Sequence, residues 1–191
     1  MLHQDILPAR ILDGLLTCVG RVGLAKTTLD DVAREAGCSR ATLYRHFPGK
    51  QPLLLAAVAR DADRVTADVV AAADATDTLA DAAGAVVTTG SSALAGHRAL
   101  VFVLMVEPEA LLPYMSFERG DALLANAAAR IAPAFARFLP ADRALRLAEW
   151  LVRMSISYLC SPEENVLFDD ARVRTLVEDF VLPGLTQGVH Q

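Results

Sequence analysis

Polar residues suited to contacting a nucleic acid are concentrated in one short stretch, residues 28–47. The candidates there are Arg40, Thr42, Tyr44, Arg45 and His46. Arginine can pair with guanine or with phosphate, and the hydroxyl groups of Thr and Tyr can bond phosphate. Between Arg34 and Lys50 a single acidic residue, Glu35, opposes the basic ones. These residue types at this density predict contact with DNA.

The charge of the chain is unevenly distributed. The whole chain carries a net charge of −5, which by itself argues against a nucleic-acid partner. Residues 1–50, however, carry +2 and residues 51–191 carry −7. A small basic head on an acidic body is compatible with local DNA contact. We therefore expect a DNA-binding domain at 1–50 and a second domain at 51–191.

Two short helices joined by a tight turn would have to position these side chains. Thr28 is a natural N-cap, and Asp31 three residues later can complete a capping box. Gly37 suits a left-handed helix stop, and Ser39 suits the cap of the next helix. Leu43 provides an apolar contact for the preceding helix. This arrangement is typical of a helix-turn-helix, whose second helix lies in the major groove.

The remainder of the chain shows helical periodicity and no strand pattern. We expect further helices at about 6–22, 50–73, 78–95, 98–106, 116–138, 142–160 and 170–182, the one at 116–138 bent near Pro133. The fold class is all-α, an N-terminal three-helix helix-turn-helix domain plus a C-terminal helical domain. No apolar run reaches the ~18 residues of a membrane span, and the N-terminus lacks a secretory signal. A cytoplasmic protein with no membrane partner is expected.

The segment 28–50 resembles the DNA-binding domain of the TetR family of bacterial repressors. The matching residues are Thr28, Val32-Ala33, Ala36-Gly37-Cys38-Ser39, Thr42-Leu43-Tyr44-Arg45-His46-Phe47 and Lys50. Cys38 departs from the family, which usually has a branched apolar residue there. The resemblance covers about residues 5–60, and beyond them it is architectural only.

The resemblance implies a role for each matching residue. Thr28 and Lys50 would contact backbone phosphate at helix starts, where the helix dipole favours an anion. The residues implied to set the register on phosphates are Ser39, Thr42, Tyr44 and His46. Arg40 and Arg45 are the candidates for base contacts, and Leu43 and Phe47 would be core.

The family also implies a homodimer on a palindromic operator in double-stranded DNA, with its two recognition helices roughly 34 Å apart. The last two long helices would pair with those of a second subunit. The residues predicted for this interface are Leu147, Leu151, Met154, Tyr158, Val173, Leu176, Val177 and Phe180. Their alternative role is to pack inside one subunit.

A small hydrophobic effector is expected to bind the C-terminal domain, where it would release a repressor from its operator. The predicted pocket residues are Phe102, Met105, Tyr114, Met115, Phe117, Phe135, Trp150 and Met154. Ordinary core packing is the alternative for each of them.

No phosphate-binding loop, no HExxH or GxSxG motif and no paired Cys/His ligands occur in the sequence. Neither an enzyme, a metal site nor a cofactor is therefore expected. The three cysteines, Cys18, Cys38 and Cys160, form no CxxC pair and are expected to be reduced thiols. Two alternative functions remain open: a helical protein-binding adaptor, and a redox-responsive regulator acting through Cys38.

Overall fold

The computed structural model of the chain describes residues 6–111, 120–159, 170–181 and 183–184. Within these ranges all regular elements are helical and none is a strand, so the predicted all-α class is confirmed. The chain divides into two compact units. The first comprises residues 1–62 and 96–116, and the second comprises residues 63–95 and 117–191. The helix α4 (Lys50–Asp74) contributes residues to both.

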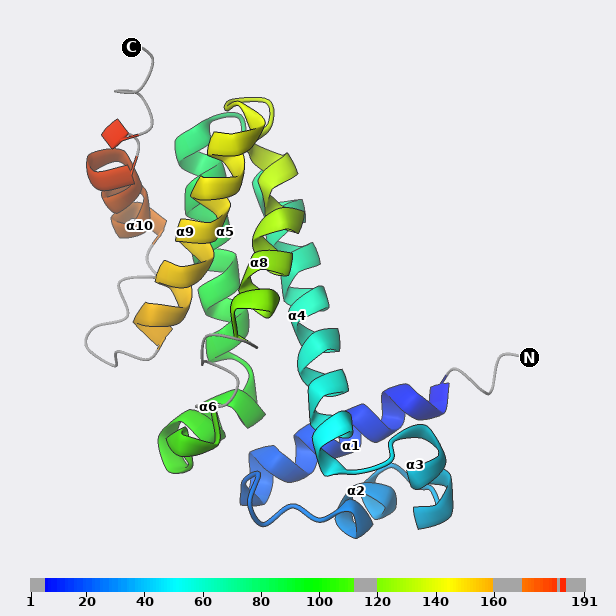
Figure 1. Ribbon diagram of the computed structural model, residues 1–191. Helices are drawn as coiled ribbons and strands as arrows, with labels where there is room; N and C mark the ends of the chain where they lie inside the picture. Colours follow the sequence, from blue (N-terminus) through cyan, green and yellow to red (C-terminus); the bar gives the residue numbers. More distant parts are fainter. Residues whose placement is uncertain (1–5, 112–119, 160–169, 182, 185–191) are drawn as a thin grey trace. The chain divides into compact units, whose positions relative to one another are not determined.

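The first unit contains the short helices of the predicted helix-turn-helix (Figure 1). Its elements are α1 (Ile6–Val22), α2 (Leu29–Glu35), α3 (Arg40–His46), the first turns of α4, α6 (Arg98–Val106) and the 3-10 turn η1 (Pro108–Leu111). Helix α1 packs against both α2 and α6. A segment some fifty residues beyond the end of α3 thus belongs to the same compact unit as the helix-turn-helix.

The core of the first unit is a continuous apolar cluster drawn from all of its α-helices. Ile11 and Leu15 of α1, Leu43 of α3 and Leu53 of α4 have no exposed surface. Val103 brings α6 into the same cluster. Burial of a leucine or isoleucine side chain contributes about 1.5–3 kcal/mol, so these contacts hold the short helices in place.

The second unit is a bundle in which α5 (Leu79–Ala95), α8 (Gly120–Ile131) and α9 (Ala141–Leu159) run alongside one another (Figure 1). Helix α10 (Asp170–Leu176) packs on α5 and continues as the π-helical turn η4 (Val177–Val181). Phe135 and Leu151 are fully buried in the core of this bundle, and Val69 and Ala73 of α4 belong to the same core. Small residues on α5, such as Ala82 and Ala83, allow its neighbours to approach closely.

One predicted helix is divided in the structure. The pattern at 116–138 indicates a single helix bent near Pro133, whereas α8 ends at Ile131 and a 3-10 turn, η2 (Ala132–Phe135), follows. Proline has no N–H to donate and its ring crowds the preceding turn, so the α-helix cannot continue through it. Residues 116–119 and the predicted loop at 161–169 lie outside the described residues.

Among the described helices, none is by itself long and apolar enough to cross a membrane. Only α5 and α6 taken together, as a sharply bent pair, reach that length and composition.

Candidate nucleic-acid interface

A reciprocal cap holds the start of α2. The backbone N–H of Asp31 donates to the Thr28 hydroxyl oxygen at 3.2 Å, and the backbone N–H of Thr28 donates to the Asp31 carboxylate at 3.3 Å. The Thr28 hydroxyl also donates to this carboxylate. Hydrogen bonds from Thr28 stabilise the ionised form and lower the pKa of Asp31. The predicted capping box is confirmed, and the Thr28 hydroxyl proton already has a partner inside the protein.

The turn between α2 and α3 depends on a glycine and two hydrogen bonds. Gly37 has φ +62°, the left-handed conformation that glycine adopts without strain. The Arg10 guanidinium reaches from α1 and donates to the carbonyl of Ala36 at 2.6 Å. A Cβ at position 37 would lie 2.6 Å from Nη2 of Arg10, so this guanidinium would have to move away from the Ala36 carbonyl. The Ser39 hydroxyl accepts from the N–H of Thr42 at 3.1 Å, which confirms the predicted cap of α3.

Helix α3 is anchored through its inner face. Leu43 is fully buried against Val32, also fully buried, and Ala33. Phe47 is half-buried and packs against the same cluster, and Cys38 does likewise. The predicted packing of the two helices is therefore confirmed, and it leaves the opposite face of α3 outside the core.

That outer face carries most of the predicted DNA contacts. Arg40, Tyr44 and Arg45 are exposed, with 39% of the surface of Tyr44 accessible. Thr42 and His46 are half-buried at its edges. An exposed face with two guanidinium groups and a phenol can meet both phosphate and base edges.

Arg40 has a partner that the sequence pattern does not reveal. Its Nη1 atom lies 3.1 Å from Oδ2 of Asp30, in the first turn of α2. Its guanidinium also lies over the Tyr44 ring, 5.5 Å from the ring centre. Asp30 and Arg40 are ten residues apart on different helices, so only the tertiary packing brings them together.

Lys50 lies at the start of α4, as predicted, but its ammonium group faces the protein. Its Nζ atom donates to the carbonyl of Leu24, in the loop between α1 and α2. Burial lowers the pKa of Lys50, and the nearby negative charge of Glu107 opposes this shift. The Glu107 carboxylate accepts from the N–H of Ala25 at 3.0 Å. Lys50 and Glu107 thus hold the loop that precedes Thr28, and sequence reasoning did not assign Glu107 this role.

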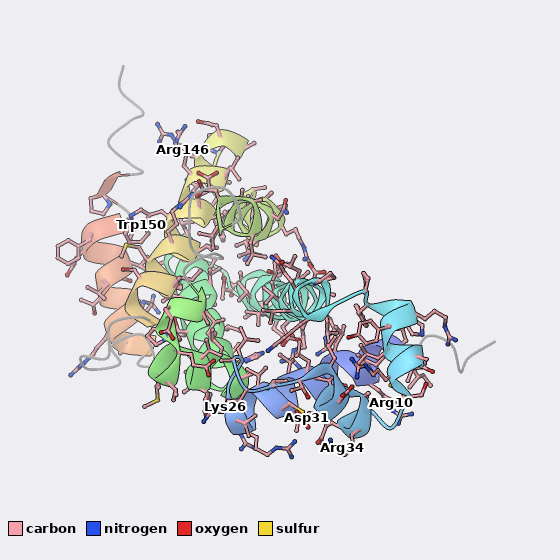
Figure 2. The ribbon with its side chains drawn as sticks, turned by 60° about the horizontal axis from the view of Figure 1, so that its bottom comes forward. Arg10, Lys26, Asp31, Arg34, Arg146 and Trp150 are labelled. Atoms are coloured by element: carbon pink, nitrogen blue, oxygen red, sulfur yellow. The ribbon has the colours of Figure 1, made fainter. Side chains whose placement is uncertain are left out.

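Basic residues lie around this region too. Lys26 and Arg34 are exposed, and Figure 2 shows both on the outer side of the loop and of α2, with Asp31 nearby. Arg34 forms an ion pair with Asp31 at 3.2 Å. Part of the positive charge beside α3 is thus balanced by an ion pair within α2.

The residues predicted to line an effector pocket fall in both units. In the first unit Phe102 is half-buried and Met105 is 79% exposed. In the second unit Phe135 is fully buried in the core, Trp150 is exposed and Met154 is half-buried. Outside the described residues lie Tyr114, Met115 and Phe117. Phe135 packs as core, and the pocket stays a prediction.

The residues predicted for the dimer interface separate into two groups. The first group is buried within the chain, with at most 3% of the surface of each residue exposed, and consists of Leu147, Leu151, Val173 and Val177. These four pack in the core of their own protomer, so an interface on α9 and α10 has to use other side chains. Phe180 is 75% exposed, and Met154 and Leu176 are half-buried. For Tyr158 the helix position alone is described.

Comparison with known proteins places the N-terminal unit in a family. Residues 11–57 match the sequence model described as "Bacterial regulatory proteins, tetR family". An uncharacterized HTH-type transcriptional regulator of Mycobacterium tuberculosis is 29% identical over 192 residues, covering 96% of this chain and 88% of that protein. The HTH-type transcriptional regulator AlkX of the same species is 29% identical over 188 residues, covering 90% of this chain and 85% of that protein.

A solved structure has the same fold across both units. The crystal structure of the TetR family repressor AlkX from Dietzia sp., implicated in biodegradation of n-alkanes, aligns with a TM-score of 0.71 and 19% identity. The alignment covers 94% of this chain and 95% of that chain. The match to the family begins in α1 and ends in α4, so it contains the exposed face of α3 and both helix caps. Residues 11–57 of the chain thus match the DNA-binding domain of the tetR family, and the relatives that match across both units are HTH-type transcriptional regulators.

Proposed function

We propose that the exposed face of α3 and the caps beside it form the contact surface for duplex operator DNA. The residues assigned to this surface are Thr28, Ser39, Arg40, Thr42, Tyr44, Arg45, His46 and Lys50. The observation that carries the proposal is the exposure of Arg40, Tyr44 and Arg45 on a helix whose opposite side is anchored by the fully buried Leu43. A short helix fixed in this way can enter a major groove without losing its support.

The assigned roles follow from each side chain's position. The hydroxyls of Ser39 and Thr42 lie 2.8 Å apart at the start of α3, where backbone N–H groups attract a phosphate. Arg40 and Arg45 are exposed and long enough to reach base edges. Thr28 and Lys50 would exchange their contacts with Asp31 and the Leu24 carbonyl for contacts with phosphate. We place the functional boundary near residue 50, because the assigned contacts end at Lys50.

The dimer is proposed to form through the outer faces of α9 and α10. Exposed apolar side chains support this choice: Trp150 is 45% exposed and Phe180 is 75% exposed. Figure 2 shows Trp150 on α9 with Arg146 one turn before it. Aromatic residues are enriched at protein–protein interfaces relative to the rest of the surface. Two heads held in this way would bind the two halves of a palindromic operator.

Repression that is relieved by a small hydrophobic effector is the regulatory part of the proposal. An effector acts in this way when it binds the DNA-incompetent state more tightly than the DNA-competent one. The continuous helix α4 has residues in both compact units, which supports communication between an effector in the second unit and the head. A repressor from Rhodococcus jostii, KstR, is 39% identical over 56 residues, although these are only 26% of that protein.

Selection of duplexes from a random pool, followed by affinity measurements on the enriched sequence, tests the proposal. The variants Tyr44→Ala and Arg45→Ala should each weaken binding by roughly tenfold or more, the order of one good base or phosphate contact. The matched control is Arg64→Ala, an exposed arginine of the second unit that lies on α4 and belongs neither to the proposed contact surface nor to α9 or α10. Affinity should also fall steeply with salt, because phosphate contacts release counterions. Unchanged affinity in both head variants would refute the assignment.

A further inference from the structure

The guanidinium of Arg40 has two partners: a carboxylate from α2 and an aromatic ring from the next turn of α3. Asp30 of α2 contributes a carboxylate oxygen 3.1 Å from Nη1, and Tyr44 contributes a ring centred 5.5 Å from the guanidinium carbon. Because these partners approach from different directions, they restrict the side chain more than an isolated surface ion pair would. Arg40 is the first residue of α3, the end of a recognition helix that contacts base edges.

The contact with Asp30 leaves the other N–H donors of the Arg40 guanidinium available to DNA. A guanidinium has five N–H donors in one plane, and Asp30 accepts from the Nη1 side. The other donors remain for two adjacent acceptors, which is the pattern that guanine presents in the major groove with N7 and O6. The negative charge of Asp30 lies well within a Debye length of any phosphate that Arg40 could bind, so it disfavours that alternative.

We propose that Asp30 is a specificity-determining residue that positions Arg40 to recognise a guanine in each half of the operator. This inference rests on the proposed function, since it requires α3 to lie in the major groove. Asp30 acts through Arg40 and needs no contact with DNA of its own. It differs from Arg45, for which the described part of the chain shows no ion pair and which is therefore not held by a carboxylate.

The experiment uses the full-length protein and the duplex that the wild type enriches from a random pool. Each guanine is replaced in turn by 7-deazaguanine, which removes the N7 acceptor and leaves base pairing intact. Dissociation constants are measured for the wild type, Arg40→Ala, Asp30→Ala and Asp30→Glu. Glu35→Gln is the matched control, because Glu35 is another acid of α2 whose ion pair, at 3.1 Å, is with Arg21 and not with α3. Far-UV circular dichroism checks that each variant is folded.

Replacement of one guanine in each half-site should lower the affinity of the wild-type protein for the duplex roughly tenfold, the order expected for a bidentate arginine contact. Arg40→Ala should bind the normal and the modified duplex equally at that position. In Asp30→Ala the loss of affinity on replacement of that guanine should fall below about threefold. This variant should also bind a scrambled duplex more tightly than the wild type does, because it lacks one negative charge near the DNA. Asp30→Glu should restore part of the discrimination. Glu35→Gln should keep the full effect.

Each other result has a distinct meaning. A full tenfold effect in Asp30→Ala would overturn this inference and leave DNA binding by α3 intact. The inference would also be overturned if, in Arg40→Ala, replacement of every guanine still lowered the affinity as much as it does in the wild type. A wild-type protein that enriches no duplex at all would overturn the proposed function, and this inference with it.

Discussion

His97 joins two helices of the first unit through both nitrogens of its ring. Its Nδ1 atom accepts a hydrogen bond from the backbone N–H of Leu100 at 3.1 Å and so caps α6. Its Nε2 atom lies 2.6 Å from Oδ2 of Asp61 on α4. Because Nδ1 is an acceptor here, the ring proton lies on Nε2 and is donated to the carboxylate. The other carboxylate oxygen accepts from Arg60 at 3.2 Å.

The cost of removing this imidazole follows from its two bonds. Loss of a helix N-cap costs about 1 kcal/mol. Asp61 is only 8% exposed, so the loss of a partner for its carboxylate costs a further 1–3 kcal/mol or so. His97→Ala should therefore lower the free energy of unfolding by about 2–4 kcal/mol. His97→Asn should recover about 1 kcal/mol, because Asn caps a helix well but is too short to replace the Asp61 contact.

Urea unfolding followed by far-UV circular dichroism measures these values, at one protein concentration because the proposed dimer would make stability depend on concentration. A double-mutant cycle with Asp61→Ala should give a coupling energy of about 0.5–3 kcal/mol. Arg64→Ala, an exposed change in the second unit, should alter stability by less than about 0.5 kcal/mol. A coupling energy near zero, or an Asn variant no more stable than the Ala variant, would refute the reasoning.

Two other features give measurable expectations. The pKa of Asp31 is lowered by its hydrogen bonds from Thr28, so its contribution is complete above the unfolded-state pKa and is lost as pH falls through the lower folded-state pKa. The stability gap between wild type and Asp31→Asn, from urea midpoints, should close in acid below about pH 4, and a gap independent of pH would contradict this origin. The double change Trp150→Ala with Phe180→Ala should shift sedimentation from dimer towards monomer while the helical content is kept, since both side chains are exposed. A double variant that sediments wholly as dimer at low micromolar concentration would place the interface elsewhere.

The predictions that succeeded concern neighbours in the chain. The caps at Thr28 and Ser39 depend on hydrogen bonds between residues three apart, and the left-handed conformation of Gly37 depends on its own lack of a Cβ. The inward position of Leu43 follows from the period of a helix, which neighbouring apolar residues display. Such features are visible in the sequence because their physical causes lie within one or two helical turns.

The predictions for the dimer interface and the effector pocket depend on which part of each apolar helix face is covered by a neighbouring element. On α9, Leu147 and Leu151 are buried in the core of the second unit while Trp150 is exposed, although all three are apolar residues of one amphipathic helix. Periodicity shows that a stripe exists, but the elements packed against it decide which part is covered. Phe135, which was predicted to line a pocket, is fully buried in the core cluster of the second unit, and the pocket stays a prediction.

The sequence by itself determined the helical class of this protein, the helix-turn-helix and the outward-facing basic residues of α3. Each of these rests on local hydrogen bonds and on the spacing of apolar residues along a helix. Only the tertiary structure decided that Asp30 faces Arg40, that Lys50 holds the loop at Leu24 and that His97 meets Asp61. Those contacts join residues 10–36 positions apart, and their partners are chosen by how whole helices pack and not by any pattern along the chain.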